Sequence, residues 1–182
     1  MKALKGNIIF TSSPEKFTVY ENSYLVESKG RVYGIFKELP EELKEIQVDD
    51  FGNSLIIPGF VDMHTHAPQF QNIGIGLDEE LLEWLNRYTF PEESKYGDEE
   101  YAKKVYTNVV KDLCKNGTTR VVLFSSIHKN GTRILMDILD KAGIGAYVGK
   151  VNMDRNSPDY YVENTEESLR STKEWVEETK DR

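Results

Sequence analysis

The chain has 182 residues, 38% of them hydrophobic and 30% charged, a composition that can bury a core and is not typical of a disordered or collagen-like polymer. Its formal net charge of -8 would repel phosphate backbones and anionic lipid surfaces, which excludes nucleic acid and membranes as main partners. The single cysteine, Cys114, excludes an internal disulfide framework and a cysteine-rich zinc site. Since neither a signal-peptide core nor about 18 consecutive apolar residues occur, we expect a cytoplasmic protein.

Short groups of β-forming residues fill the first part of the chain, residues 1–53. Four such groups stand out, at residues 7–11, 17–20, 24–26 and 32–36. The turn-forming sequence Ser-Lys-Gly at residues 28–30 separates the last two groups and predicts a hairpin. We therefore expect a small antiparallel sheet in this part of the chain.

The patterning changes at Ser54. A continuous apolar run from Leu55 leads to His64 and is typical of a strand that is buried on both faces. This run predicts the first strand of a new unit, which we expect to cover residues 54–182.

Helices and strands are predicted to alternate through this second unit. A helix begins at the capping residue Asp78 and runs through Tyr88, and a longer helix begins at Asp98 and ends at Asn116 and Gly117. A strand at residues 119–127, a helix at 132–141, a strand at 146–153 and a helix at 165–179 follow. This order predicts three β/α units with parallel strands and right-handed crossovers, whereas a complete (β/α)8 barrel needs roughly 250 residues. If the unit is a barrel, less than half of it is present.

Two histidines follow the apolar strand directly. His64 and His66 are two residues apart, so their side chains point to the same face of the strand. At the C-terminal end of a parallel strand, where barrel enzymes hold their active sites, two imidazoles fit a Zn²⁺ or Fe²⁺ ion. A His-x-His pair alone is a weak motif, and a structural role for both histidines is the alternative.

The residues around this pair carry a resemblance to a known family. Residues 58–66 read PGFVDMHTH, after a β-rich leader and before β/α units, and resemble the amidohydrolase superfamily of metal-dependent hydrolases. Residues 66–70, HAPQF, and residues 81–91, LLEWLNRYTFP, are similar to the guanine deaminases of that superfamily. The resemblance implies an α/β fold in which part of a small β-sandwich domain, residues 1–53, precedes the first three β/α units of a TIM barrel, residues 54–182.

The resemblance also implies an activity and a site. The activity is the hydrolytic deamination of guanine to xanthine and ammonia, a step of purine catabolism, by a homodimer that binds Zn²⁺ or Fe²⁺. His64 and His66 would be metal ligands, and the segment of His66, Ala67, Pro68 and Gln69 would contact the substrate. The Gln69 amide offers a donor and an acceptor, which suits the mixed edge of a purine, although an ordinary polar loop residue is the alternative.

Other residues near this segment have structural alternatives of equal or greater weight. Trp84 and the neighbouring Leu82 could line the substrate pocket, but core packing accounts for both as well. His128, at the end of the second strand, is expected to orient a ligand or a loop rather than bind the metal. Asp62 most simply makes a hydrogen bond at the strand end, and the acidic run at residues 163–178 is most simply a solvated helix face.

The chain lacks part of the site that the resemblance implies. The superfamily needs two further histidines and an aspartate from later strands, and guanine deaminases add a glutamate for proton transfer, whereas this chain has three histidines in total. We therefore expect no catalytic proton-transfer residue before Arg182, and an inactive protein if residues 1–182 stand alone. The alternatives are another deaminase or cyclic amidohydrolase of the superfamily, and a non-catalytic truncated fragment. The coding sequence beyond Arg182 would distinguish them.

Overall fold

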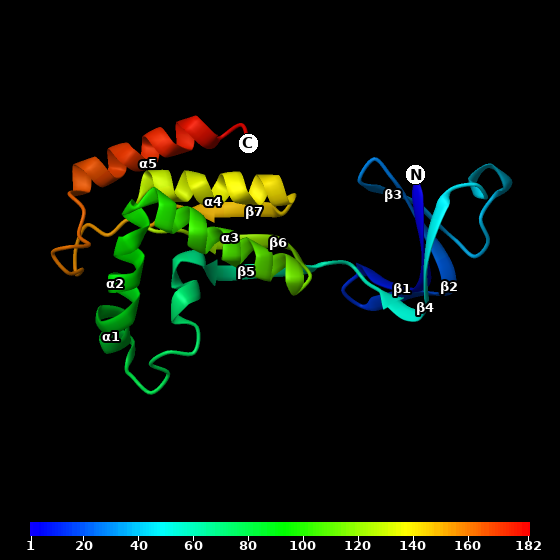
Figure 1. Ribbon diagram of the computed structural model, residues 1–182, viewed down its shortest axis with the longest axis horizontal. Helices are drawn as coiled ribbons and strands as arrows, with labels where there is room; N and C mark the ends of the chain where they lie inside the picture. The colour runs from blue at the N-terminus through cyan, green and yellow to red at the C-terminus, as the bar shows by residue number, and fades with distance from the viewer. The chain divides into compact units, whose positions relative to one another are not determined.

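The computed structural model describes residues 1–182 and divides into two compact units, Met1–Pro58 and Gly59–Arg182 (Figure 1). Each unit has a hydrophobic core of its own. The core of the first unit contains Ala3, Val26 and Leu43, and the larger core of the second unit lies between its sheet and its helices. None of the helices combines the length and the apolar character that crossing a membrane requires.

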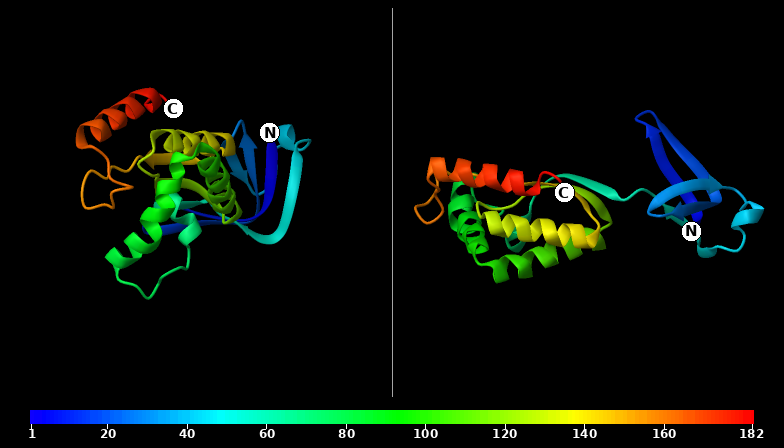
Figure 2. Two further views of the ribbon diagram at one scale, coloured as in Figure 1. Left: turned by 60° about the vertical axis from the view of Figure 1, so that its left-hand side comes forward. Right: turned by 90° about the horizontal axis from the view of Figure 1, so that it is seen from above.

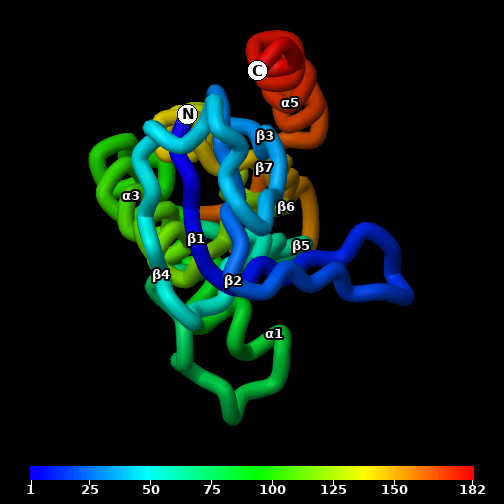
Figure 3. Tube along the Cα trace, turned by 90° about the vertical axis from the view of Figure 1, so that its right-hand side faces the viewer, coloured from blue at the N-terminus to red at the C-terminus, as the bar shows by residue number.

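The first unit is a four-stranded sheet with the strand order β3-β2-β1-β4. Its strands are β1 (Lys2–Ser13), β2 (Lys16–Ser28), β3 (Arg31–Phe36) and β4 (Gln47–Ile56), and a 3-10 turn, η1 (Glu41–Leu43), precedes β4. The sheet is mixed rather than antiparallel throughout as expected, because β1 pairs antiparallel with β2 and parallel with β4. The tip of the β1–β2 hairpin extends away from β3 and β4 (Figure 3).

The hairpin predicted at residues 28–30 is confirmed. Strands β2 and β3 pair antiparallel on either side of it. Lys29 (φ 53°) and Gly30 (φ 76°) take the left-handed conformation that a two-residue hairpin turn of this kind needs at both central positions.

The apolar run that predicted one strand contains two. Residues 55–56 end β4, where they pair with β1, and a new strand, β5 (Phe60–His66), starts only after Pro58. Pro58 has no backbone N–H to donate, and Gly59 is needed because a Cβ there would lie 2.1 Å from the Thr119 side chain. The first unit therefore ends at residue 58 rather than at residue 53, since an apolar run cannot reveal where one strand stops and the next begins.

The second unit is built on a three-stranded parallel sheet with the order β5-β6-β7, in which β6 spans Thr118–Phe124 and β7 spans Gly145–Gly149. Helices α3 (Glu99–Lys115) and α4 (Lys129–Ala142) cover one face of this sheet, and α5 (Thr165–Thr179) lies beside α4 (Figures 1 and 2). Three parallel strands, each followed by a helix, confirm the predicted α/β fold with three β/α units.

The helix ends confirm most of the predicted capping residues. The Asp98 side chain accepts hydrogen bonds from the backbone N–H groups of Glu100 (2.9 Å) and Tyr101 (3.2 Å) at the start of α3. Gly117 (φ 79°) and Gly143 (φ 73°) follow the ends of α3 and α4 in the left-handed conformation that glycine adopts without strain. Strands β6 and β7 end at residues 124 and 149 rather than at 127 and 153, because the residues that follow leave the sheet and form loops.

The helix predicted to begin at Asp78 begins later and runs further. It consists of α1 (Leu81–Trp84), a π-helical turn η3 (Leu85–Thr89) and α2 (Phe90–Glu93). Pro91 has no backbone N–H to donate to the carbonyl group four residues before it, as a continuous α-helix requires. A wider π-helical turn before the proline accommodates this missing hydrogen bond. The extension places Glu93, at the end of α2, within hydrogen-bond distance of Gln69.

Candidate metal and substrate site

The two predicted histidines lie at the C-terminal end of β5, on the same face of the strand. The ring centroids of His64 and His66 are 5.1 Å apart. Phe124, which pairs with His66 at the end of β6, contacts both imidazoles, with centroid distances of 5.5 Å to His64 and 5.1 Å to His66. The backbone N–H of His64 donates to Asp62 Oδ1 at 3.0 Å, which fits the strand-end role predicted for Asp62. The alternation of side chains along a strand predicted that the histidines lie together. Apart from the position of Phe124 near a strand end, nothing in the sequence predicted its contact with them.

The two imidazoles suit a divalent metal as a partial ligand set. Burial, together with the adjacent His64 ring, lowers the pKa of His66, which favours the neutral imidazole that binds metals through a lone pair. No group of three or more His, Cys, Asp or Glu side chains that could hold a metal occurs in the structure. The pair therefore fits two positions around a divalent ion, one fewer than the three protein ligands of a typical catalytic zinc site.

A cavity of about 380 Å³, which we call the histidine cavity, lies against this pair. Its lining includes His64, His66, Ala67, Gln69 and Trp84, so the structure brings together five of the six residues predicted for the site. The Trp84 ring is fixed by a hydrogen bond from its Nε1 to a backbone carbonyl oxygen, at 2.9 Å. That these residues bind a metal and the substrate stays a prediction.

The sixth predicted residue, Pro68, does not line the histidine cavity. It is buried in a 3-10 turn, η2 (Ala67–Asn72), where its carbonyl oxygen accepts a hydrogen bond from the Tyr96 hydroxyl at 3.0 Å. Tyr96 lies in a second such turn, η4 (Ser94–Gly97), and is fully buried, and this burial raises its pKa. Pro68 thus anchors the segment that carries Gln69. Leu82 is 71% exposed and also lies outside the cavity lining.

Gln69 is held by a carboxylate that the sequence did not single out. Its Nε2 donates to Glu93 Oε1 at 3.0 Å, and the Tyr161 hydroxyl donates to the other carboxylate oxygen, Oε2, at 2.8 Å. Glu93 is only 6% exposed, and burial raises its pKa while the hydrogen bonds from Gln69 and Tyr161 oppose the rise. One amide hydrogen of Gln69 is therefore already committed inside the protein.

The preceding residue, Glu92, is equally buried but faces other partners. Its carboxylate accepts a hydrogen bond from the Tyr101 hydroxyl and pairs with Lys95 Nζ at 2.6 Å. Burial and this carboxylate raise the pKa of Tyr101 to about 12. The two neighbouring carboxylates at the end of α2 thus serve different networks.

His128 stands apart from the histidine pair. It precedes α4, and its Nδ1 lies 3.0 Å from the Ser126 hydroxyl, while its ring centroid is 6.3 Å from that of Tyr161. Burial lowers the pKa of His128. This placement is in line with the prediction that His128 orients a loop rather than binds a metal.

A buried ion pair braces the loop between β7 and α5, which carries Tyr161. The Lys150 side chain is fully buried, and its Nζ lies 3.1 Å from Glu163 Oε1. The second oxygen of Glu163 accepts a hydrogen bond from the Met153 N–H at 2.9 Å. Glu163 is therefore not part of the solvated helix face predicted for residues 163–178, although the acidic side chains of α5 itself are exposed as predicted.

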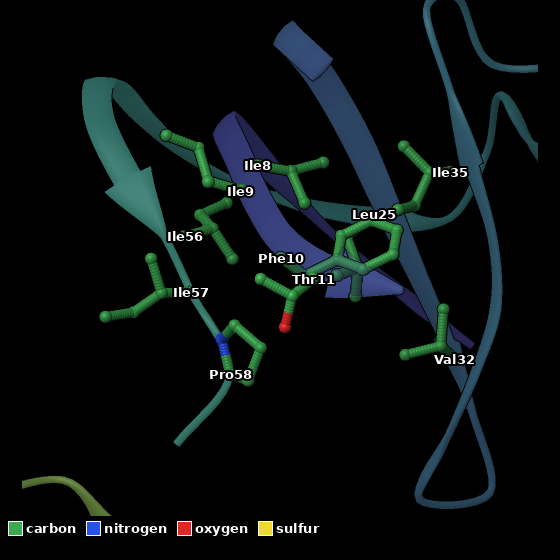
Figure 4. Close-up of a pocket in the computed structure, with 10 residues that line it drawn as sticks. All are labelled: Ile8, Ile9, Phe10, Thr11, Leu25, Val32, Ile35, Ile56, Ile57 and Pro58. Carbon is green, nitrogen blue, oxygen red and sulfur yellow. The ribbon is translucent and has the colours of Figure 1, made fainter. Parts of the chain in front are cut away.

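A second cavity, of about 430 Å³, lies in the first unit, and we call it the apolar hollow (Figure 4). Its lining consists of Ile8, Ile9, Phe10, Thr11, Leu25, Val32, Ile35, Ile56, Ile57 and Pro58. None of these side chains titrates or binds metals well, and only that of Thr11 is polar. The apolar hollow therefore offers no groups for catalysis, in contrast to the histidine cavity.

Comparison with known proteins identifies the family of the chain. The model of the Amidohydrolase family matches residues 55–182, which is most of the chain. The chain belongs to the amidohydrolase family. The family resemblance predicted from residues 58–66 is thereby confirmed.

Individual amidohydrolases are similar to the chain over nearly its whole length. The guanine deaminase of Dictyostelium discoideum is 39% identical over 97% of this chain and 43% of its own length. A crystal structure of guanine deaminase from C. acetobutylicum with bound guanine in the active site matches with a TM-score of 0.93 and 52% identity, over 100% of this chain and 43% of that one. The atrazine chlorohydrolase TrzN from Arthrobacter aurescens TC1, solved with zinc, shares the fold alone at 14% identity and a TM-score of 0.78, over 97% of this chain and 43% of that one. The chain thus spans less than half the length of these relatives.

Proposed function

We propose that the full-length gene product containing this chain is a guanine deaminase, which hydrolyses guanine to xanthine and ammonia. The observation that carries the proposal is the 52% identity, over the whole chain, to a protein solved with guanine in its active site. The grouping of His64, His66, Gln69 and Trp84 around one cavity supports it.

The histidine pair would hold a divalent ion, with His64 and His66 as two of its ligands. Zinc is the ion we propose, with Fe²⁺ as the alternative, since imidazole nitrogen suits both and zinc is present in an amidohydrolase of the same fold. Bound there, such an ion supplies water activation near neutral pH.

The remaining lining residues would bind and orient the purine. Gln69 is positioned to hydrogen-bond the base, and the Trp84 indole offers a flat apolar surface against which a base can pack. Ala67 leaves room beside His66, and Pro68 fixes the backbone through Tyr96. Because the pocket is partly closed, a substrate that left Gln69 unpaired would bind poorly.

Proton transfer would depend on residues outside this chain. We propose that an Asp and a Glu beyond Arg182 supply it, so that residues 1–182 alone bind metal weakly and turn over no guanine. We also propose a homodimer, from the resemblance, and a cytoplasmic enzyme, from the sequence features given above.

Ammonia release and xanthine formation from the full-length gene product test the proposal. Guanine should be deaminated, and adenine and cytosine should be spared. Equal or faster turnover of cytosine by the metal-loaded protein would instead favour a different deaminase of the family.

A further inference from the structure

We propose that Glu93 is a positioning residue that fixes the side-chain amide of Gln69 with its carbonyl oxygen toward the histidine cavity. The substrate must then present an N–H group to Gln69. This inference rests on the proposed function and adds to it a reason for the choice of base.

The geometry joins three separate elements at one carboxylate. Gln69 comes from the turn after β5, Glu93 from the end of α2, and Tyr161 from the loop between β7 and α5. Their hydrogen bonds, at 3.0 Å to Gln69 and 2.8 Å to Tyr161, use both oxygens of Glu93. Glu93 is 6% exposed and Tyr161 is 1% exposed, so water competes little for these bonds.

The chemistry of the carboxylate decides which end of the Gln69 amide faces it. Both carboxylate oxygens of Glu93 accept hydrogen bonds, one from Gln69 Nε2 and one from the Tyr161 hydroxyl, so the amide NH₂ points toward Glu93. The inverted amide would set its oxygen against Glu93 Oε1, and no Lys, Arg or His pairs with Glu93 to relieve the repulsion. The Tyr161 hydroxyl donates as well and cannot take the place of the amide donor.

The fixed amide gives the cavity an acceptor. Gln69 lines the histidine cavity, whereas Glu93 does not. With one hydrogen of its NH₂ committed to Glu93, Gln69 turns Oε1 toward the cavity, where it can accept from a ring N–H or an amino group. Guanine carries such donors next to each other at its N1 and its 2-amino group. A purine with a bare ring nitrogen at that place would meet the oxygen with a lone pair, which is repulsive.

Glu92 provides a matched control within the same helical turn. It has the same exposure as Glu93, 6%, and the same charge, but its partners are Lys95 and Tyr101, not Gln69. A general effect of removing a buried charge at the end of α2 should appear in both positions. An effect through Gln69 should appear only at Glu93.

The experiment is a double-mutant cycle in the full-length gene product, with KM and kcat for guanine as the readout. Glu93→Gln has nearly the same shape but can donate as well as accept, so it permits the inverted Gln69 amide. We expect it to raise KM for guanine by about tenfold, with kcat and metal content changing little. In the Gln69→Leu background the same substitution should change KM by less than about twofold, and Glu92→Gln should leave KM unchanged.

A second readout follows the amide itself. In ¹⁵N-glutamine-labelled protein, the side-chain NH₂ signal of Gln69, assigned by its loss in Gln69→Leu, should exchange slowly with solvent. Exchange should accelerate in Glu93→Gln and stay slow in Glu92→Gln. Tyr161→Phe, which removes the other donor to Glu93, serves in both experiments if Glu93→Gln does not fold.

The outcomes separate this inference from the proposed function. If the effect of Glu93→Gln on KM persists in the Gln69→Leu background, or if Glu92→Gln matches it, Glu93 is only structural and the inference is wrong. If the wild-type protein does not deaminate guanine, the proposed function fails, and the exchange of the Gln69 NH₂ then decides the orientation of the amide by itself.

Discussion

The two units hold cavities of similar size and opposite chemistry. The apolar hollow measures about 430 Å³ and the histidine cavity about 380 Å³. The first is lined by aliphatic and aromatic carbon, whereas the second brings together two imidazoles, an amide and an indole. Size therefore does not identify the functional site here. The convergence of polar groups from strand ends and their loops is the reason we propose the histidine cavity as that site.

The largest effect is expected when the imidazoles of the histidine cavity are removed. If the proposed function holds, His64→Ala or His66→Ala should abolish turnover of guanine by the full-length gene product, because each would remove one of the two proposed metal ligands. Removal of a residue that only hydrogen-bonds to a metal ligand typically lowers activity by about 10- to 100-fold, and the loss here should be larger. Metal content per chain, measured beside turnover, checks the cause.

His128→Ala is the matched control, since it removes the only other histidine. It should keep the metal. Normal metal content and activity in the His64 and His66 variants would show that the pair is structural.

The buried ion pair of the second unit should also be costly to break from one side. Lys150→Met leaves the largely buried Glu163, 15% exposed, without its cation, and breaking a buried pair in this way lowers the free energy of unfolding by up to about 3–5 kcal/mol. Lys129→Met removes a partly exposed lysine that pairs with Glu174 and Glu178, and should lower it by at most about 1 kcal/mol. Chemical unfolding of both variants measures the difference, and equal losses would contradict the role given to burial.

Gln69→Leu tests whether the histidine cavity binds the substrate through Gln69. It would remove the proposed hydrogen bond to the base, and it leaves Glu93 short of one donor, so kcat/KM for guanine should fall by about 10- to 100-fold, which corresponds to about 1–3 kcal/mol. Metal content should stay normal. Gln71→Leu, an exposed glutamine of the same turn, should change neither quantity. A Gln69→Leu variant that loses metal but keeps KM would assign Gln69 to support of the histidines.

The smallest effect is expected in the apolar hollow. Val32 is 63% exposed there, and Val32→Thr keeps its shape while replacing one methyl group by a hydroxyl. The free energy of unfolding should change by no more than about 0.5 kcal/mol, and KM for guanine should stay unchanged. An altered KM would show that the first unit takes part in substrate binding.

The sequence predicts those parts of the molecule that depend on neighbours along the chain. Asp98 caps its helix because its partners lie two and three residues ahead, and His64 and His66 share a face because a strand alternates. The apolar run at residues 55–64 gave a wrong prediction of a single strand, because the run contains the end of one strand and most of the next, in different units. Local pattern therefore located the histidine pair but not the boundary before it.

Glu93 and Tyr161 could not be predicted in the same way. They are 68 residues apart and meet at Gln69 only because a turn, a helix end and a loop fold together. In the sequence, Glu93 is the second of two adjacent glutamates, and nothing distinguishes it from Glu92. The direction in which the end of α2 points determines which of the two glutamates, Glu92 or Glu93, contacts Gln69.

That direction depends on the π-helical turn at Leu85–Thr89. A turn of this kind holds one residue more than the α-helical turn it replaces, so the chain carries the equivalent of a single-residue insertion. Deleting one residue there would restore α-helical phase and rotate everything after it by about 100°. Glu93 would swing away from Gln69, and a different side chain would take its direction. If Glu93 positions Gln69 as we propose, the spacing of residues in this helix, as much as their identity, determines which base the site would accept.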